Sequence, residues 1–447
     1  MLSKFKPVSI SLSPNVQKDD IQLVVKLLFQ PWKWKKGSAI KELENEFKKY
    51  LGVKYAFSFN SGRSSLFAIL KSLNLEKNNN ILLQAFTCNA VPNPVLWAGL
   101  NPIYVDCADD FNIDIKDLDR LIRANKSRVL IVQHTFGLPA NMDEVNLIVD
   151  GSENSSRSEN SLPRQNNLIL IEDCAHALGA GFNGKKVGTF GDAAFFSFSR
   201  DKVISCVYGG MAVTNDDEIG KKLEALSRYA RSGEARQKEF SYPSYGWIFQ
   251  QLLHPILLNF IILPLYNFLD LGKIFLVLSQ WLHLLSKAVN WKEKRGLKPD
   301  YFPKVLPNAL AILAKHQLNK LEKFNNHRKK IAGFYYKELS NTKFILPEKN
   351  NNIFLRFAVR HSKAHEIIYE AWHKENILLG DWYRSPIDPN DTRLEEIKYR
   401  EGMCKNAEAL SKKTLNLPTH INISLQPRSG QAISDAERIV NFLKKYK

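Results

Sequence analysis

The sequence contains few cysteines and no leader-like segment, and both shortages restrict the classes of protein that it can represent. Its five cysteines form an odd set, and none belongs to a C-x-x-C pair. This pattern argues against a disulfide framework and a structural zinc site and suits a reducing cytosol, so no metal site is predicted. Residues 1–15 lack an apolar stretch long enough for a signal peptide, and we therefore expect a cytoplasmic protein.

Acidic residues are also scarce relative to basic ones. Asp and Glu number 45 against 63 Lys and Arg, which gives a formal net charge of +18. Such a charge attracts anionic partners, among them nucleic acids, phosphorylated metabolites and anionic membranes. The lysines are spread along the chain, and no basic motif interleaved with aromatic residues marks a nucleic-acid-binding module. We therefore expect no nucleic acid partner.

The first half of the chain has the pattern of an α/β domain. The order strand, glycine-containing turn, helix recurs through the first 235 residues, and several of the strands are continuous apolar runs, as in strands that helices cover on both faces. The sequence thus predicts a three-layer sandwich around a mostly parallel sheet. Strands are expected at 101–106, 129–134, 168–173, 193–198 and 209–215.

The 447 residues divide into three predicted regions. Residues 1–235 form the large domain, within which 150–167 has the composition of a disordered surface insertion. Residues 236–300 form an apolar helical insertion. Residues 301–447 begin with a long charged helix and continue as a smaller C-terminal α/β domain.

Two ionisable residues stand where a catalytic site is expected. Asp173 ends the apolar strand LILIED, at the sheet edge where open α/β folds bind ligands. A carboxylate buried there needs a cation, unless it caps a helix or forms an internal ion pair. The protonated ring nitrogen of pyridoxal phosphate is such a cation, and Lys202, in FSFSRDK, supplies the amine that this cofactor also requires.

A phosphate-binding turn is predicted at NSGRSS, residues 60–65. Its glycine precedes a helix, whose free N–H groups and dipole favour an anion, although the same pattern also occurs in plain strand-to-helix connections. Gly209 and Gly210, which follow Lys202, are expected where the backbone packs too closely for a side chain.

Six motifs appear in a characteristic order: NSGRSSLFAIL, QAFTCNAVPNPVLWAGLNPIYVD, QHTFGLPANMDEV, IEDCAHALGA, GDAAFFSFSRDK and GGMAVTND. In this order they resemble the DegT/DnrJ/EryC1/StrS family of pyridoxal-phosphate-dependent sugar aminotransferases, from LENEF near residue 43 to LNLPTH at 415–420. The resemblance implies fold type I of the pyridoxal-phosphate enzymes, which is similar to the fold of aspartate aminotransferase and contains a mostly parallel sheet of about seven strands.

The resemblance also assigns roles near the reacting end of the cofactor. It implies that Lys202 is the catalytic residue and forms the internal Schiff base with pyridoxal 5′-phosphate, and that Asp173 binds the pyridinium nitrogen. His176 stands where the family has Gln or His beside the phenolic oxygen. Lysine at 202 separates the chain from the dehydratase branch, which replaces this lysine.

Other positions match the cofactor's phosphate and ring. Ser197 matches a phosphate-binding serine, and Gly62 and Arg63 fall on the family's Gly-Thr phosphate turn; an arginine binds phosphate well. Cys88 takes the place of the aromatic ring that commonly covers the cofactor. Residues 303–305, Pro-Lys-Val, align with a stretch that in many members reaches the phosphate site of the neighbouring subunit, and Lys304 is a candidate phosphate ligand there.

The resemblance therefore implies a homodimeric transaminase. The expected donor is L-glutamate and the expected acceptor is a keto-sugar, nucleotide-linked, for surface polysaccharide or glycoconjugate synthesis. The alternative is a non-catalytic relative that binds the cofactor or a sugar as a regulatory module docked at a membrane.

The insertion contains an uncharged run at 247–269 and a second apolar run at 274–285. The first is long enough to span a bilayer. However, Lys202 precedes it and the small domain follows it, and both must lie on one side of a membrane to form one site. Pro255 and Pro264 also favour broken helices.

Two alternatives remain for these helices, because apolar surface of this extent is seldom left exposed. In the first, the region 247–290 lies in an anionic membrane interface, and the protein is peripheral on the inner face of the cytoplasmic membrane. In the second, the helices are buried against a partner subunit or the protein's own core. The membrane alternative uses Trp247, Trp281 and Trp291 as anchors and the basic segment 292–298 as a headgroup contact.

Overall fold

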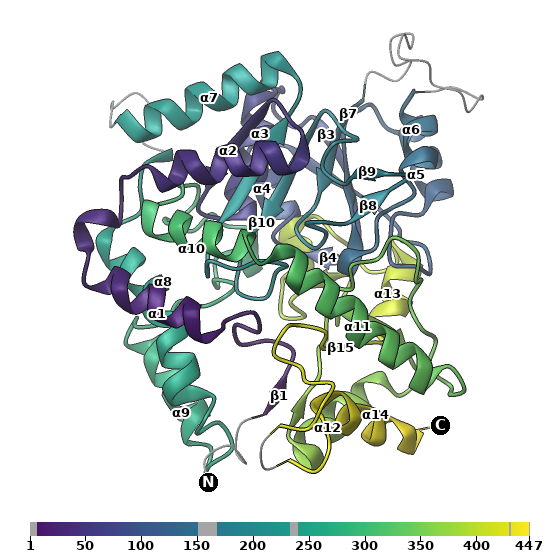
Figure 1. Cartoon of the computed structure of the whole chain (residues 1–447). Coiled ribbons are helices and arrows are strands. Elements are labelled where there is room, and N and C mark those ends of the chain that lie inside the picture. Colours follow the sequence, from purple (N-terminus) through teal and green to yellow (C-terminus); the bar gives the residue numbers. More distant parts are fainter. Residues whose placement is uncertain (1–6, 151–167, 233–239, 429–430, 447) are drawn as a thin grey trace.

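The protein is described by a computed structural model that covers residues 7–150, 168–232, 240–428 and 431–446 (Figure 1). The insertion expected at 150–167 lies, apart from Asp150, outside these described residues.

A seven-stranded sheet forms the centre of the large domain, with the strand order β2-β11-β10-β7-β6-β3-β5. Strand β11 is antiparallel to both neighbours, and the other pairs are parallel. The predicted mostly parallel sheet is confirmed, and each predicted strand lies within two residues of an observed one. The strands are β2 (Tyr55–Phe59), β3 (Asn80–Gln84), β5 (Asn101–Val105), β6 (Ser127–Gln133), β7 (Ile169–Asp173), β10 (Ala193–Ser197) and β11 (Gly210–Thr214).

Helices cover both faces of this sheet because consecutive strand residues are apolar on both sides. Phe195 packs with α3 (Gly62–Ser72), α4 (Pro92–Trp97) and α7 (Asp217–Ser232). Phe196 points to the opposite face, where its ring lies 5.0 Å from that of Phe47 in α2 (Ala39–Leu51), beside α10 (Asn308–Leu318). The other strands bury Leu130 and Leu170 under α5 (Ile115–Ala124) and α6 (Met142–Asp150). The result is the predicted three-layer sandwich.

The C-terminal region forms its own apolar core beside the large domain. Helix α11 (Leu321–Leu339) leads into it, and β12 (Phe357–Arg360) pairs antiparallel with β15 (Thr414–Leu417). Helices α12 (Ala364–Glu375), α13 (Lys405–Ser411) and α14 (Asp435–Leu443) complete this region (Figure 1).

Two short strand pairs join distant parts of the chain. Strand β1 (Val8–Ser9) pairs with β13 (Ile377–Leu378), so the first described residues lie against the C-terminal region. Strand β4 (Thr87–Cys88) pairs with β14 (Ile387–Asp388), which fixes a C-terminal loop at the edge of the large sheet. A small hairpin, β8 (Gly181–Phe182) and β9 (Lys185–Lys186), follows β7.

The apolar insertion is a broken helical hairpin, as its prolines predicted. Helix α8 (Tyr245–Leu257) contains Pro255 and runs into a π-helical turn, η5 (Leu258–Ile262), before α9 (Leu271–Trp281) returns. The Asn259 side chain donates to the Pro255 carbonyl at 2.9 Å, satisfying one acceptor at this break. Within the described parts of the chain, no helix combines the length and apolar character needed to cross a membrane.

One predicted anchor is wrong. Trp247 is half-buried, and its ring lies 5.5 Å from the Tyr208 ring, because α8 turns this side chain toward the protein core. Trp281 and Trp291 are 74% and 57% exposed, as a surface role requires.

A stability prediction follows from Gly210. A Cβ atom there would lie 2.5 Å from backbone atoms of Ser61, so Gly210→Ala must push β11 away from the phosphate turn. We expect the free energy of unfolding to fall by about 1–3 kcal/mol in urea denaturation. The control is Gly333→Ala in α11, where a Cβ meets nothing within 4 Å, and this variant should be unchanged or stabilised. Equal effects of the two changes would contradict the packing argument.

Candidate functional site

One cavity of about 180 Å³ brings together the predicted catalytic and cofactor-binding residues, whereas Lys304, the candidate ligand for a neighbouring subunit's phosphate site, is not part of its lining. It opens at the C-terminal ends of β7 and β10, where parallel strands leave loops free to carry functional groups. Its lining includes Gly62, Arg63, Cys88, Asp173, His176, Ser197 and Lys202.

Asp173 is a buried carboxylate at the end of β7. Burial raises its pKa to about 6, although the Ala175 N–H donates to its Oδ1 at 2.9 Å and the nearby Lys202 acts in the opposite direction. The carboxylate is therefore held in its charged form at some cost at neutral pH. A cation placed next to it would remove that cost.

Lys202 and His176 form the central contact of the cavity, with 2.8 Å between Lys202 Nζ and His176 Nε2. The Phe136 N–H points to His176 Nδ1 at 3.3 Å, and burial holds the pKa of the imidazole well below its ordinary value. The ring is therefore held neutral, with Nδ1 facing the Phe136 N–H and Nε2 facing the Lys202 amine. Burial also lowers the pKa of Lys202, although the charges of Asp201 and Asp173 act in the opposite direction.

An aromatic and cationic stack closes the side of the cavity nearest the C-terminal region. The Trp382 ring lies 5.3 Å from the His176 ring in a near-parallel stack, and Lys202 Nζ lies 4.5 Å from the Trp382 ring centroid. Arg356 lies 3.3 Å from the same centroid and forms a 3.0 Å ion pair with Asp201. The stack thus connects back to the residue that precedes the lysine.

Sequence reasoning missed this stack. Trp382 and Arg356 lie in the C-terminal region, far along the chain from Lys202, and no local motif connects them to it. Asp388, on β14, also lines the cavity, and burial together with the Asp381 charge raises its pKa to about 7.

The predicted phosphate end lies at the start of α3. The Ser61 hydroxyl caps this helix by accepting from the Ser64 N–H, and the first N–H groups of a helix have no partner within it. A Cβ added at Gly62 would lie 3.1 Å from the Ser197 Cβ, so the glycine leaves room beside the serine. This arrangement is suited to an anion.

The guanidinium of Arg63 is already engaged by the insertion. Its Nε lies 2.5 Å from Oε1 of Glu293, a fully buried carboxylate, and Nη2 donates to the Ala288 carbonyl at 3.3 Å. Arg200, which the sequence analysis did not select, donates to the carbonyl of Ser286 at 2.6 Å. The segment 286–293 of the insertion therefore forms part of the cavity wall.

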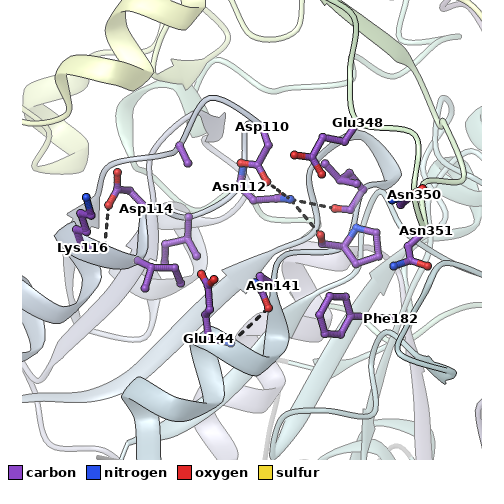
Figure 2. Close-up of a pocket in the computed structure, with 15 residues that line it drawn as sticks. Asp110, Asn112, Asp114, Lys116, Asn141, Glu144, Phe182, Glu348, Asn350 and Asn351 are labelled. Carbon is purple, nitrogen blue, oxygen red and sulfur yellow. Dashed lines mark hydrogen bonds between the residues drawn. The ribbon is translucent and has the colours of Figure 1, made fainter. Parts of the chain in front are cut away.

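A second cavity, of about 480 Å³, lies elsewhere and is chemically different. Figure 2 shows the carboxylates of Asp110, Asp114, Glu144 and Glu348 around it, with Lys116 at one side. Burial raises the pKa of Asp110. Since this acidic lining would repel a phosphate, the Lys202 cavity is the better candidate for a phosphorylated cofactor.

A comparison with protein families identifies the family of this chain. The family model described as the DegT/DnrJ/EryC1/StrS aminotransferase family matches residues 14–247 and 302–430. The chain belongs to this family. The stretch between the matched parts contains most of α8 and all of α9, so the apolar hairpin lies outside the family pattern.

Individual relatives share only limited sequence identity with this chain. It is 30% identical to a GDP-perosamine synthase from Caulobacter vibrioides over 50% of this chain and 57% of that one, so the chain spans about half the length of such curated relatives. It is 25% identical to UDP-4-amino-4,6-dideoxy-N-acetyl-beta-L-altrosamine transaminase from Helicobacter pylori, over 96% and 97% of the two chains. The solved PseC aminotransferase of Helicobacter pylori has a TM-score of 0.71 at 21% identity, covering 99% of each chain.

Pyridoxal phosphate is the cofactor of this family, and the Lys202 cavity fits it. Asp173 offers a carboxylate in need of a cation, Lys202 an amine whose pKa burial lowers, and Gly62 with Ser197 an anion cradle at the start of a helix. At the position where the family commonly has an aromatic ring over the cofactor, the cavity lining contains Cys88, which is half-buried.

The raised pKa of Asp173 predicts an unusual pH dependence of stability. Because the folded protein binds this proton more readily than the unfolded chain, the group's contribution to stability is complete below pH 3.8 and is lost as the pH rises through about 6. In cofactor-free protein, Asp173→Asn should therefore raise the free energy of unfolding at pH 8, by up to about 3 kcal/mol.

The measurement is urea denaturation of both proteins at pH 8 and at pH 4, where the difference should vanish. The amide oxygen still accepts from the Ala175 N–H, so that bond is kept in both proteins. A variant that is less stable at pH 8, or a difference that does not depend on pH, would contradict the buried-charge account.

Proposed function

We propose that the protein is a transaminase that moves an amino group from L-glutamate to a nucleotide-linked keto-sugar, for surface polysaccharide or glycoconjugate synthesis. The observation that carries the proposal is the contact between Lys202 and His176 beside the buried Asp173. A lysine amine close to a buried carboxylate is the pair of groups that pyridoxal phosphate requires.

Each group has a chemical task in this proposal. Bound pyridoxal phosphate supplies an electron sink for the carbon that loses a proton. Asp173 would hold the proton on the ring nitrogen, since its charge is stabilised by a cation there. Lys202 would hold the cofactor covalently, and its released amine would carry the proton between the donor's α-carbon and the cofactor's C4′. A lowered pKa makes this amine an effective base near neutral pH.

The residues around Lys202 position its amine. The contact with His176 Nε2 orients the Lys202 amine, and the Trp382 ring limits where the freed amine can lie. Overall, the amino group of glutamate exchanges with the keto oxygen of the sugar, so the reaction needs no external oxidant or reductant.

The substrate class is supported by the relatives and by charge. Two relatives are described as a GDP-perosamine synthase and a UDP-sugar transaminase, and we extend nucleotide-linked sugars to this chain from them. A net charge of +18 would favour a substrate that carries phosphates. Glutamate as the donor rests on the family resemblance.

We also propose a cytoplasmic homodimer. All five cysteines, each within the described residues, are free thiols, which suits a reducing compartment. The homodimer rests on the family resemblance. Lys304 stays a candidate ligand for the phosphate site of the neighbouring subunit, and within its own chain its Nζ donates to the Ser241 hydroxyl at 2.8 Å.

The test is a donor and acceptor screen with glutamate and keto-sugar nucleotides, read out as 2-oxoglutarate. Wild type should release it, and Lys202→Ala should lower the rate by about 10²–10⁴-fold or more, because both the covalent link and the base are lost. Lys323→Ala, which changes an exposed lysine in α11, serves as the matched control and should stay close to wild type.

The alternative, a non-catalytic module that binds cofactor or sugar, predicts a different result. It expects wild type to give the absorbance band of lysine-bound cofactor but no 2-oxoglutarate with any acceptor. A rate in Lys202→Ala equal to that of wild type would contradict the catalytic assignment directly.

A further inference from the structure

The helical hairpin of α8, η5 and α9 exposes large apolar side chains that the proposed reaction does not use. We call its outward side the hairpin face. Its most exposed members are Phe260, Leu269, Ile274, Val277, Trp281 and Leu282, with exposed fractions between 50% and 79%. Patches of this kind on a soluble protein mark a partner or a membrane.

The apolar residues of α9 form one continuous stripe. Ile274, Val277, Leu278, Trp281 and Leu282 recur at the spacing i, i+3, i+4, i+7 and i+8, which places them along one side of the helix. Gly272 is the one buried residue of α9 among those described. The stripe is therefore fully presented to the surroundings, as in helices that lie on a lipid surface.

The hairpin contacts the C-terminal region near its turn and is held together at its base. The Tyr266 ring packs at 5.5 Å against Trp372 of α12, and the Gln250 side chain of α8 donates to the His283 carbonyl, just after α9, at 2.8 Å. Figure 1 shows α9 at the outer edge of the molecule, beyond α8. The apolar stripe is thus held outward by polar and aromatic contacts.

Charge distinguishes the possible occupants of this face. Between residues 245 and 286 the charged side chains are Asp270 and Lys273, which neutralise each other in a 2.7 Å ion pair. Cationic residues lie at the margins: Lys35 Nζ is 4.3 Å from the Tyr245 ring centroid, and Lys287 is exposed a few residues after α9. The result is an apolar centre with a positive margin.

This arrangement favours an anionic lipid surface over a second copy of the chain. Two copies that met through the hairpin face would bring positive margins together, whereas anionic headgroups would attract them. Trp281, on the stripe itself, is 74% exposed, as an interfacial indole would be. Helix α9 has eleven residues, or about 16 Å, roughly half of a bilayer core, so it suits an orientation in the membrane plane.

We propose that the hairpin face docks the protein peripherally on an anionic membrane surface, the inner face of the cytoplasmic membrane. The apolar stripe of α9 inserts among the acyl chains and headgroups, and the basic margin contacts the anionic lipids. Because segment 286–293 continues from α9 into the wall of the Lys202 cavity, docking holds the active site close to that membrane.

The experiment is flotation of the cofactor-loaded protein with vesicles of phosphatidylcholine alone or with about one third phosphatidylglycerol. We expect wild type to float with the anionic vesicles, to float less with the neutral ones, and to be released partly by high salt. The double variant Val277→Asp/Trp281→Asp should bind at least about tenfold more weakly, because two exposed apolar anchors are replaced by anions.

The matched control is Ile345→Asp/Met403→Asp, which adds the same charges at positions 54% and 50% exposed, outside the hairpin. It should float like wild type, and both variants should keep the wild-type melting temperature and lysine-bound cofactor band. These readouts do not depend on transaminase activity, so the docking proposal can fail or succeed separately from the proposed function.

Three outcomes would overturn the proposal. Wild type could remain unbound to anionic vesicles at low salt, or the control variant could lose binding as strongly as the hairpin variant. Alternatively, wild type could be a dimer that Val277→Asp/Trp281→Asp converts to monomers without any vesicle binding, which would assign the face to a second copy.

Discussion

The cost of placing Asp173 and Lys202 in one water-poor cavity is the constraint on which the site depends. Burial disfavours the charged form of both groups, raising the pKa of the carboxyl to about 6 and lowering that of the amine. His176, whose pKa burial holds well below its ordinary value, lies beside the amine as a neutral ring. A cation next to Asp173 would relieve the cost of burying its charge, which makes the cavity complementary to a protonated ring nitrogen.

The architecture serves this arrangement by joining three parts of the chain at one sheet edge. The parallel strands supply Asp173 and Ser197 at their C-terminal ends, and the C-terminal region supplies Trp382 with Arg356 behind it. The insertion supplies the third wall through Glu293, which holds Arg63. The same segment that carries the exposed hairpin thus also shapes the predicted phosphate end.

Local sequence patterns predicted the strands and the acidic pair that ends β7, and the order of the motifs assigned Asp173 and Lys202 through the family resemblance. Spacing alone could not separate Glu172 from Asp173. In the structure, Glu172 accepts from the backbone N–H groups of Gly188, Phe190 and Gly191, which leaves Asp173 for the cavity. Trp382 was not predictable in this way, because contacts between distant segments decide its place. The orientation of Trp247 likewise depends on how α8 packs against Tyr208.

The account makes Lys202 the point at which the protein holds its cofactor, and this claim can be tested at the level of one residue. The measurement is borohydride reduction of the protein incubated with pyridoxal phosphate, followed by peptide mapping in a mass spectrometer. The account predicts one reduced cofactor adduct, on the peptide that contains Lys202. An adduct on another lysine, or none under conditions that reduce a lysine-bound cofactor, would contradict it.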